Sequence, residues 1–432
     1  MRNTKVTKAG KKGSSPTRVE PLEYVSLFSG AMGLDLGLES AGFRPVVVNE
    51  IDEAAVATIR ANRPELPVLT KSIAELRAKD FSAAAGKNLR GIDLVVGGPP
   101  CQAFSVFGQR KGILDTRGVL VFEFIRVIAE LKPKYFLMEN VRGLHSMPAF
   151  PKSALKDNPS IDPSMTQPGS LLRLIFERFE QIGYRVDGYL VNSVNYGAPQ
   201  IRERLLCIGN RCGLKVDFPQ PTHSNRPADG LLPFRTLGDA IGAGFSDPDP
   251  SSMEFSARKL KYLGMVPPGG NWRSLAVEIQ KESMGKAWFL KGGRSAYWRR
   301  LSFDFPSPTV VTMPNHAGTS MCHPTETRAL TVGELAAVQE FPRDWRFVGT
   351  PTEKCRQIGN AVPPRLGRVA GEAISAAIRL RDSQGVTRSK APSAVEHLRP
   401  HVRTRSFFKR GKALKLNASY YAEENTLFSQ VK

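Results

Sequence analysis

The sequence has little cysteine, fewer acids than bases and no hydrophobic run long enough to cross a membrane. Its 432 residues include only 5 cysteines at irregular spacing, which favours reduced thiols over a disulfide framework. Cys207 and Cys212 lack a matching second pair, so we expect no metal site. A membrane span needs about 20 apolar residues, and the first residues resemble no signal peptide. We therefore expect a cytoplasmic protein without a membrane partner.

The shortage of acidic residues leaves a large positive charge. Lys and Arg number 61 against 40 Asp and Glu, which gives a formal net charge of +21. This excess favours a polyanionic partner, most often nucleic acid. Residues 1–20 form a basic arm that we expect to be disordered, and residues 381–432 form a basic C-terminal extension. Both can add phosphate contacts without specifying a base sequence.

Between these ends, short apolar strands alternate with amphipathic helices. The strands are expected at 24–28, 46–48, 92–96, 135–138 and 205–208, and helices at 52–62, 119–131 and 171–182. Strands that alternate with helices indicate βαβ units. The sequence thus predicts the α/β class with a doubly wound, Rossmann-like parallel sheet.

The first predicted strand leads into the glycine-containing turn "LFSGAMGLDLG". Gly30 and Gly33 allow the backbone to turn sharply and approach a ligand at a helix N-terminus. Glu50 ends the next strand, where an acid can accept hydrogen bonds from both ribose hydroxyls. The context indicates a nucleoside cofactor, either NAD or S-adenosylmethionine. Glycines that serve only tight packing are the alternative.

A thiol and a carboxyl group follow two other predicted strands. In "GGPPCQAFSVFG" two prolines end the strand 92–96 and hold Cys101 at its exit. In "YFLMENVRGL" Glu139 follows the strand 135–138, so both side chains are expected at one sheet edge. An apolar setting there would raise the pKa of Glu139 and let it act as an acid. A buried structural thiol and a solvated strand end are the simpler readings.

The segment "QIRERLLCIG" places Gln200, Arg202 and Arg204 on one side of an extended chain. Such a row can hold phosphate or brace an acid, or it can be a solvated strand face.

Together these motifs resemble the C5-cytosine methyltransferase family. The segments "LFSGAMG", "GGPPCQAFSVFGQRKG", "DTRGVL", "MENV", "QIRERL" and "RQIGNAVPP" occur in that family's order between about 22 and 380. The resemblance implies that Cys101 adds to C6 of cytosine and makes C5 nucleophilic. Glu139 would hold and protonate N3, braced by Arg202 and Arg204. The target base must be flipped out of the duplex.

The resemblance also implies a site for S-adenosylmethionine. Its residues would come from the glycine turn, the second strand, the Pro-Cys segment and the C-terminal motif: Phe28, Gly30, Met32, Gly33, Glu50, Ile51, Pro100, Asn360 and Val362. One departure is visible, because Ser72 in "LTKSIAEL" stands where the family often has an acid near the adenine amino group.

The family pattern divides the chain into a catalytic domain of two segments, 22–212 and 330–380, and a target-recognition domain at 213–329. The latter is rich in Pro, Gly, Trp and Arg without clear periodicity. We expect most of its tryptophans to form a small core. DNA contacts are expected from the loop after Cys101 and from recognition-domain arginines: Gln102, Ser105, Arg117, Arg273, Arg294, Arg299 and Arg300.

Double-stranded DNA is therefore the expected substrate of a monomeric, nucleoid-associated bacterial modification enzyme, with a possible restriction endonuclease partner. A tRNA methyltransferase of the same family and a non-catalytic nucleic-acid-binding protein are the alternatives. An NAD oxidoreductase would not explain the Pro-Cys segment. A cysteine hydrolase would need a base, and of the 6 histidines only His145 lies near these motifs in the sequence.

Overall fold

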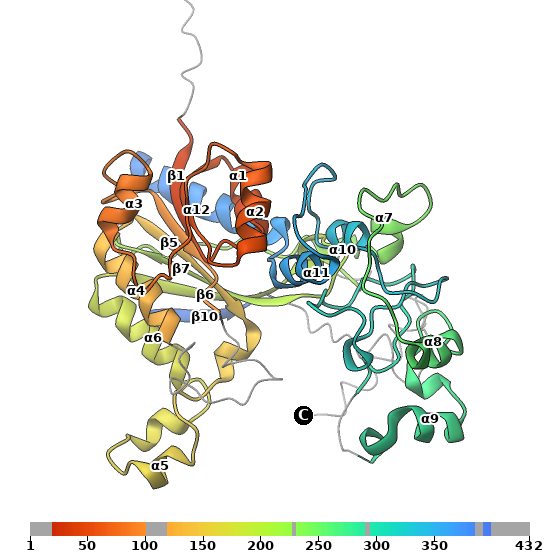
Figure 1. Ribbon diagram of the computed structural model, residues 1–432. Helices are drawn as coiled ribbons and strands as arrows, with labels where there is room; N and C mark the ends of the chain where they lie inside the picture. Colours follow the sequence, from red (N-terminus) through yellow and green to blue (C-terminus); the bar gives the residue numbers. More distant parts are fainter. Residues whose placement is uncertain (1–19, 101–118, 227–229, 290–293, 385–391, 399–432) are drawn as a thin grey trace, which may run out of the picture.

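A computed structural model describes residues 20–100, 119–226, 230–289, 294–384 and 392–398 (Figure 1). Its centre is an eight-stranded sheet with the strand order β10-β6-β7-β5-β4-β1-β2-β3. The strands are β1 (Leu22–Leu27), β2 (Phe43–Asn49), β3 (Val68–Leu69), β4 (Leu94–Gly97), β5 (Tyr135–Val141), β6 (Arg185–Asn192), β7 (Glu203–Asn210) and β10 (Ala394–His397).

The sheet is mixed, with one reversed strand. Strands β3, β2, β1, β4 and β5 are parallel, whereas β7 runs antiparallel to both β5 and β6. The α/β class and Rossmann-like architecture are confirmed, but the expectation of an all-parallel sheet is wrong at β7. Strand β6 was not among the predicted strands. The 3₁₀ turn Ser193–Tyr196 and a short connection join β6 and β7, too short for a helical crossover.

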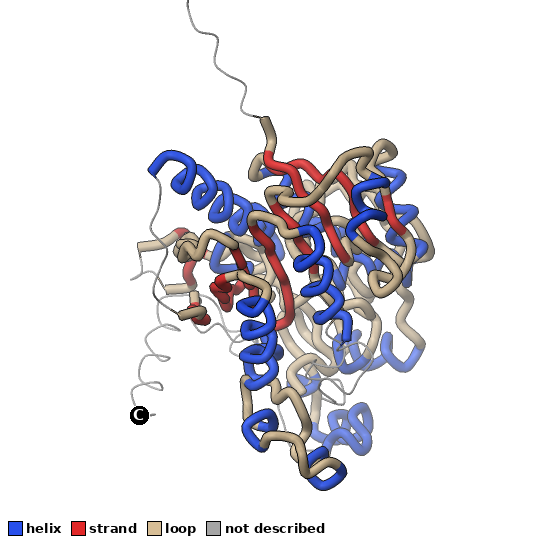
Figure 2. The backbone as a smooth tube through the Cα atoms, turned by 90° about the vertical axis from the view of Figure 1, so that its left-hand side faces the viewer, coloured by secondary structure: helices blue, strands red, loops and turns tan. Residues whose placement is uncertain are grey.

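Helices cover both faces of the sheet (Figure 2). One face is packed by α1 (Gly33–Ser40) and α12 (Pro364–Gln384). The other is packed by α3 (Ala78–Ala84), α4 (Val119–Leu131) and α6 (Ser170–Gln181). At Gly37, a Cβ atom would lie 2.0 Å from the Pro364 carbonyl oxygen. Only glycine lets α1 and the start of α12 approach so closely.

A loop-rich lobe, which lies between β7 and α10 (Val332–Val338) in the sequence, is found beside the sheet (Figure 1). It contains β8 (His223–Ser224), β9 (Leu232–Pro233), α7 (Leu237–Ile241), α8 (Ala257–Gly264) and α9 (Val277–Met284). A separate hydrophobic cluster, which includes Trp272 and Trp298, forms its core, as expected for most of the tryptophans. The remaining helices are α2 (Glu53–Asn62), α5 (Ala154–Asp157) and α11 (Pro351–Asn360).

The C-terminal extension supplies part of the sheet. Helix α12 ends at Gln384, and β10 then pairs in parallel with β6 at the sheet edge. Among the described residues, no helix is long and apolar enough to cross a membrane.

Candidate active site

A cavity of about 450 Å³ lies where the carboxyl ends of β1, β2, β4 and β5 meet. Its wall also includes the turn from α11 to α12, which returns from the far end of the sequence. The predicted cofactor residues in its lining are Phe28, Gly30, Gly33, Glu50, Ile51, Pro100, Asn360 and Val362, and the predicted catalytic residues are Glu139, Arg202 and Arg204. The fold thus gathers two distant parts of the chain around one cavity.

Met32 is a correction to the predicted cofactor residues. Its side chain is fully buried in the cluster that contains Ile59 and Leu335, and it does not line the cavity. Its backbone adopts the left-handed region at φ 64° and caps the start of α1. The residue therefore shapes the turn, and its side chain packs away from the cavity.

The glycine turn is held in an unusual backbone conformation. Phe28 has φ 56° and Gly30 has φ 53°, both in the left-handed region, which is uncommon for a bulky residue such as phenylalanine. A Cβ atom at Gly33 would lie 2.4 Å from the Val362 carbonyl oxygen. Gly33 therefore lets the returning C-terminal turn close the cavity.

Glu50 is fixed by backbone hydrogen bonds. Its carboxylate accepts from the amide of Gly30 at 2.7 Å and from the amides of Ile51 and Asp52, both at 2.8 Å. Two carboxylate oxygens have about four acceptor sites, so capacity remains for a hydroxyl ligand. The side chain of Ile51 beside it is 63% exposed and gives a flat apolar surface at the cavity. Ser72 also lines this end of the cavity.

Glu139 and Arg204 form a partly buried ion pair. In the β5–β7 ladder Arg204 lies opposite Val141, which is two residues from Glu139. Residues two apart in a strand point to the same face, so the side chains of Arg204 and Glu139 share one face of the sheet. Arg204 Nε is 2.7 Å from Glu139 Oε1. Burial raises the pKa of Glu139 above its ordinary value, although the charges of Arg204 and Arg202 oppose this shift.

Two neighbouring features set the position of Glu139. A Cβ atom at Gly98 would lie 3.1 Å from Glu139 Oε2, so a glycine there leaves room for the carboxyl group. Asn140 donates to the Pro99 carbonyl at 3.3 Å and ties β5 to the exit of β4. Glu139 and the prolines at the exit of β4 are thereby held together.

The side chain of Arg202 has a different structural role from the one expected. It is 1% exposed and donates from Nη1 to the Val310 carbonyl at 3.0 Å and from Nη2 to the Gly359 carbonyl at 2.9 Å. Arg202 and Arg204 were both expected to brace Glu139, but Arg204 makes the ion pair, so the prediction is corrected for Arg202. Arg202 anchors the returning segment to the cavity wall and acts on Glu139 only through its charge.

Cys101, Gln102, Ser105 and Arg117 lie outside the described residues. Pro100, which immediately precedes Cys101, lines the cavity together with Glu139.

The comparisons with known proteins agree with this geometry. Residues 22–376 match the model of the C-5 cytosine-specific DNA methylase family. The chain belongs to this family. The methylase is 41% identical over 366 residues to the Type II methyltransferase M.PspPI of Psychrobacter sp. (strain TA137), covering 82% of this chain and 80% of that relative. It is 39% identical over 357 residues to the Type II methyltransferase M.Eco47II of Escherichia coli, covering 81% and 78%.

A solved structure shows the same architecture. The methylase superposes on a DNA modification methyltransferase encoded within an E. coli prophage with a TM-score of 0.56 and 25% identity. The superposition covers 83% of this chain and 99% of that one. The chain is thus an enzyme, a DNA (cytosine-5-)-methyltransferase.

In the loop-rich lobe of the methylase, Arg299 and Arg300 are 5% and 4% exposed. Arg299 Nε donates to the Ser320 carbonyl at 3.2 Å, and burial lowers the pKa of Arg299 to about 10. Arg300 donates to the Val266 and Leu263 carbonyls at 2.8 and 2.7 Å. The prediction that both arginines contact DNA is corrected, because their guanidinium groups are inside the lobe and bind its backbone.

Arg273 and Arg294 of the methylase, in contrast to Arg299 and Arg300, lie against the ring of Trp272. Their guanidinium carbons are 4.4 Å and 5.6 Å from the centre of the Trp272 ring, and both side chains are half-buried. Among the described residues, Nε and Nη1 of Arg294 have no hydrogen-bond partner. Burial and the charge of Arg294 lower the pKa of Arg273. Two like charges therefore lie against one aromatic ring.

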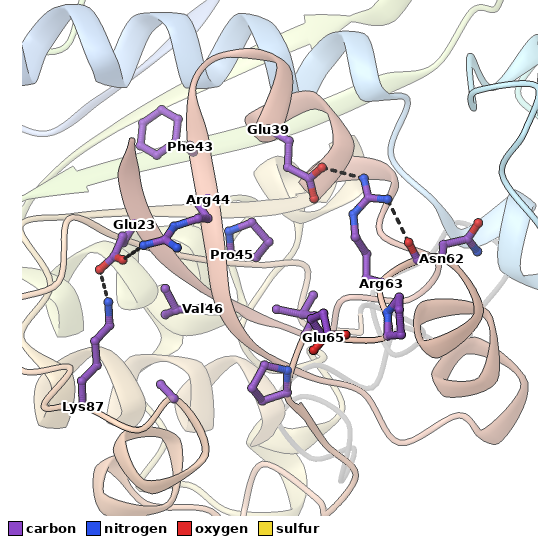
Figure 3. A pocket seen from close by; sticks show the side chains of 14 residues that line it. Glu23, Glu39, Phe43, Arg44, Pro45, Val46, Asn62, Arg63, Glu65 and Lys87 are labelled. Carbon is purple, nitrogen blue, oxygen red and sulfur yellow. Dashed lines mark hydrogen bonds and ion pairs between the residues drawn. The ribbon is translucent and has the colours of Figure 1, made fainter. Parts of the chain in front are cut away.

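A second cleft of the methylase, about 710 Å³, lies at the amino ends of β1 and β2. Figure 3 shows the ion pairs of this cleft: Glu23 binds Arg44 and Lys87, and Glu39 binds Arg63. Both acids are therefore paired with bases of the cleft itself.

Sequence reasoning missed Asp35, which also lines the active-site cavity. The sequence feature that could have revealed Asp35 is an acid within the motif "GLDLG", on the apolar side of the predicted helix. Acidic residues are rarely buried, so such a position points to a specific role.

Proposed function

We propose that this methylase transfers a methyl group from S-adenosylmethionine to C5 of a cytosine flipped out of a specific duplex DNA sequence. The observation that carries the proposal is the single cavity that places the Glu139–Arg204 ion pair beside Pro100 and the glycine turn. An acid of raised pKa next to a cysteine-bearing segment suits acid-assisted covalent chemistry on a pyrimidine.

The chain's residues fit S-adenosylmethionine. Glu50 has remaining acceptor capacity for ribose hydroxyls, Ile51 offers an apolar face for adenine, and Ser72 offers a hydroxyl near it. A cavity of about 450 Å³ suits a nucleoside-sized ligand. The cofactor supplies an electrophilic methyl group on a positively charged sulfur.

The protein groups perform the remaining steps. The thiolate of Cys101 forms a bond to C6, and the electron pair displaced from the ring is taken up as N3 receives a proton from Glu139. C5 is then electron-rich and takes the methyl group, which leaves S-adenosylhomocysteine as a neutral thioether. Loss of the C5 proton to a base, with return of the N3 proton to Glu139, expels Cys101 as the thiolate and restores the ring. Arg204 fixes the Glu139 carboxyl so that its proton faces the base.

The loop-rich lobe supplies the recognition surface in this proposal. Arg273 and Arg294 are its strongest candidates, because arginine binds phosphate and reads the guanine edge in the major groove. Curated relatives are named Type II methyltransferases. We therefore propose that the enzyme acts as a monomer on duplex DNA in a restriction-modification system with a cognate endonuclease.

The test is transfer of labelled methyl from S-adenosylmethionine to unmethylated duplex DNA, with a tRNA pool in parallel. Cys101→Ala is the test variant. Cys212→Ala is its matched control, because Cys212 is a described thiol that does not line the cavity. We expect 5-methylcytosine in DNA from the wild type and from Cys212→Ala, and none from Cys101→Ala.

DNA that contains 5-fluorocytosine tests the covalent step directly. Fluorine at C5 cannot leave as a proton, so the adduct should survive denaturing electrophoresis with wild type and be absent with Cys101→Ala. Label in tRNA alone would move the substrate to RNA. DNA binding without transfer would leave only a binding protein and refute the proposal.

A further inference from the structure

Asp35 is a buried acid in the wall of the active-site cavity. Its side chain is 1% exposed, and its Oδ1 atom has no hydrogen-bond partner among the described residues. Buried polar atoms nearly always have a partner, since an unpartnered one costs about 1–3 kcal/mol. An orphaned carboxyl oxygen at a cavity wall therefore indicates that a ligand completes it.

The sheet order locates this acid relative to the cofactor. Asp35 is in the first turn of α1, and Ser26 near the end of β1 is close enough to lower the pKa of its carboxyl group. Strand β1 lies between β2, which leads to Glu50, and β4, which leads to Pro100. With the ribose at Glu50 and the target base beyond Pro100, the sulfur of the cofactor would lie between them. The amino-acid end attached to that sulfur would then reach β1, beside Asp35.

We propose that Asp35 binds the α-ammonium group of S-adenosylmethionine and so orients the methyl-bearing sulfur. This rests on the proposed function. The cofactor has two positive groups, the sulfonium and the ammonium, but only the ammonium has N–H donors. A carboxylate–ammonium contact is a charge-assisted hydrogen bond, which is about twice as strong as a neutral one.

The surroundings of Asp35 couple this contact to pH. Burial raises the pKa of Asp35 to about 7. Its titratable neighbours are Glu39 from the same helix, which raises that pKa, and Tyr24 of β1, which lowers it, and Glu39 is itself paired with Arg63. Binding a cation favours the ionised carboxylate, so a proton is released when the cofactor binds below this pKa. Affinity should therefore weaken up to about tenfold for each pH unit below 7.

Titration calorimetry of full-length wild type and Asp35→Asn tests the contact with three probes. S-adenosylmethionine and S-adenosylhomocysteine both carry the ammonium, whereas methylthioadenosine lacks the amino-acid end. We expect Asp35→Asn to weaken the first two by about 10–100-fold and methylthioadenosine by less than about twofold. At pH 6, buffers of different ionisation enthalpy should reveal nearly one released proton per ligand with wild type and none with Asp35→Asn.

Glu39→Gln is the matched control, because it neutralises the neighbouring acid on α1 without changing a residue of the cavity lining. It should keep wild-type affinity for all three ligands to within about threefold. Equal affinity of wild type and Asp35→Asn for S-adenosylmethionine would overturn the inference, as would a loss confined to S-adenosylmethionine, which would place the acid at the sulfonium. If wild type binds none of the three, the proposed function fails instead.

Discussion

Replacing Arg300 by methionine should unfold the loop-rich lobe at a lower temperature. Methionine keeps much of the side-chain volume but has none of the guanidinium donors. In the structure those donors make five hydrogen bonds, to the carbonyls of Leu263 and Val266 on one side and to His323, Glu326 and Thr327 on the other. The side chain thus ties the end of α8 to the segment 323–327.

The size of the effect follows from the acceptors that lose their partner. The Leu263 carbonyl also accepts from the Val266 amide, and the Glu326 carbonyl from the Cys322 thiol. Among the described residues, three of the five acceptors therefore depend on Arg300 alone. Each buried polar group without a partner costs about 1–3 kcal/mol, so three give about 3–9 kcal/mol. Part of this loss is offset because a cation no longer has to be removed from water. The net expectation is about 3–5 kcal/mol, against about 0.5 kcal/mol for an ordinary surface substitution.

Tryptophan fluorescence during heating is the assay, since Trp272, Trp288 and Trp298 all belong to the core of this lobe. We expect the midpoint to fall by roughly 10 °C or more. Arg294→Met is the matched control and should keep the wild-type midpoint. A midpoint of Arg300→Met that stays within about 2 °C of wild type, together with lost DNA binding, would refute the structural role.

Three other substitutions probe the active site and the recognition surface. Glu139→Gln should lower kcat about 10²–10⁴-fold without changing cofactor affinity. The wild-type rate should fall as the pH rises through the raised pKa of Glu139, because the protonated acid is the active form. A pH–rate profile without this fall would contradict the role of Glu139. Gly98→Ala should lower kcat in the same assay, because its Cβ atom meets Glu139 Oε2 at 3.1 Å. Arg273→Ala and Arg294→Ala should each weaken DNA binding and reduce the salt slope by about one, measured by fluorescence anisotropy, and unchanged slopes would remove both from the interface.

Much of the central sheet and of the cavity at its edge could be predicted from the residue types at the strand ends. Prolines, glycines and acids at strand ends fix where the chain leaves the sheet, and these positions include Gly30 and Glu50. Glu139 was expected just after a strand at 135–138, but β5 continues to Val141 and contains it. Strand direction is not encoded in a two-residue period, so the reversal of β7 could not be read from its apolar run. Strand β6 was hidden because Asp187 and Gly188 interrupt its hydrophobic pattern.

The arginines were harder to assign than the acids. Alternation placed Arg202 and Arg204 on one side, but which of them reaches Glu139 depends on pairing with β5. Arg299 and Arg300 were expected at the surface because charged residues are rarely buried. Their burial depends on backbone carbonyls of sequence-distant loops, which no local pattern reveals.

The contact between α1 and α12 has a consequence for biosynthesis. At about 5–20 residues per second, a ribosome needs roughly 15–65 s to travel from Gly37 to Pro364. During that interval the apolar side of α1 and its face of the emerging sheet lack the cover that Leu366, Ala370 and Ile374 of α12 give in the folded protein. The nascent chain therefore exposes this apolar surface until late in synthesis, and it cannot complete the wall of the active-site cavity until the ribosome has passed Val362.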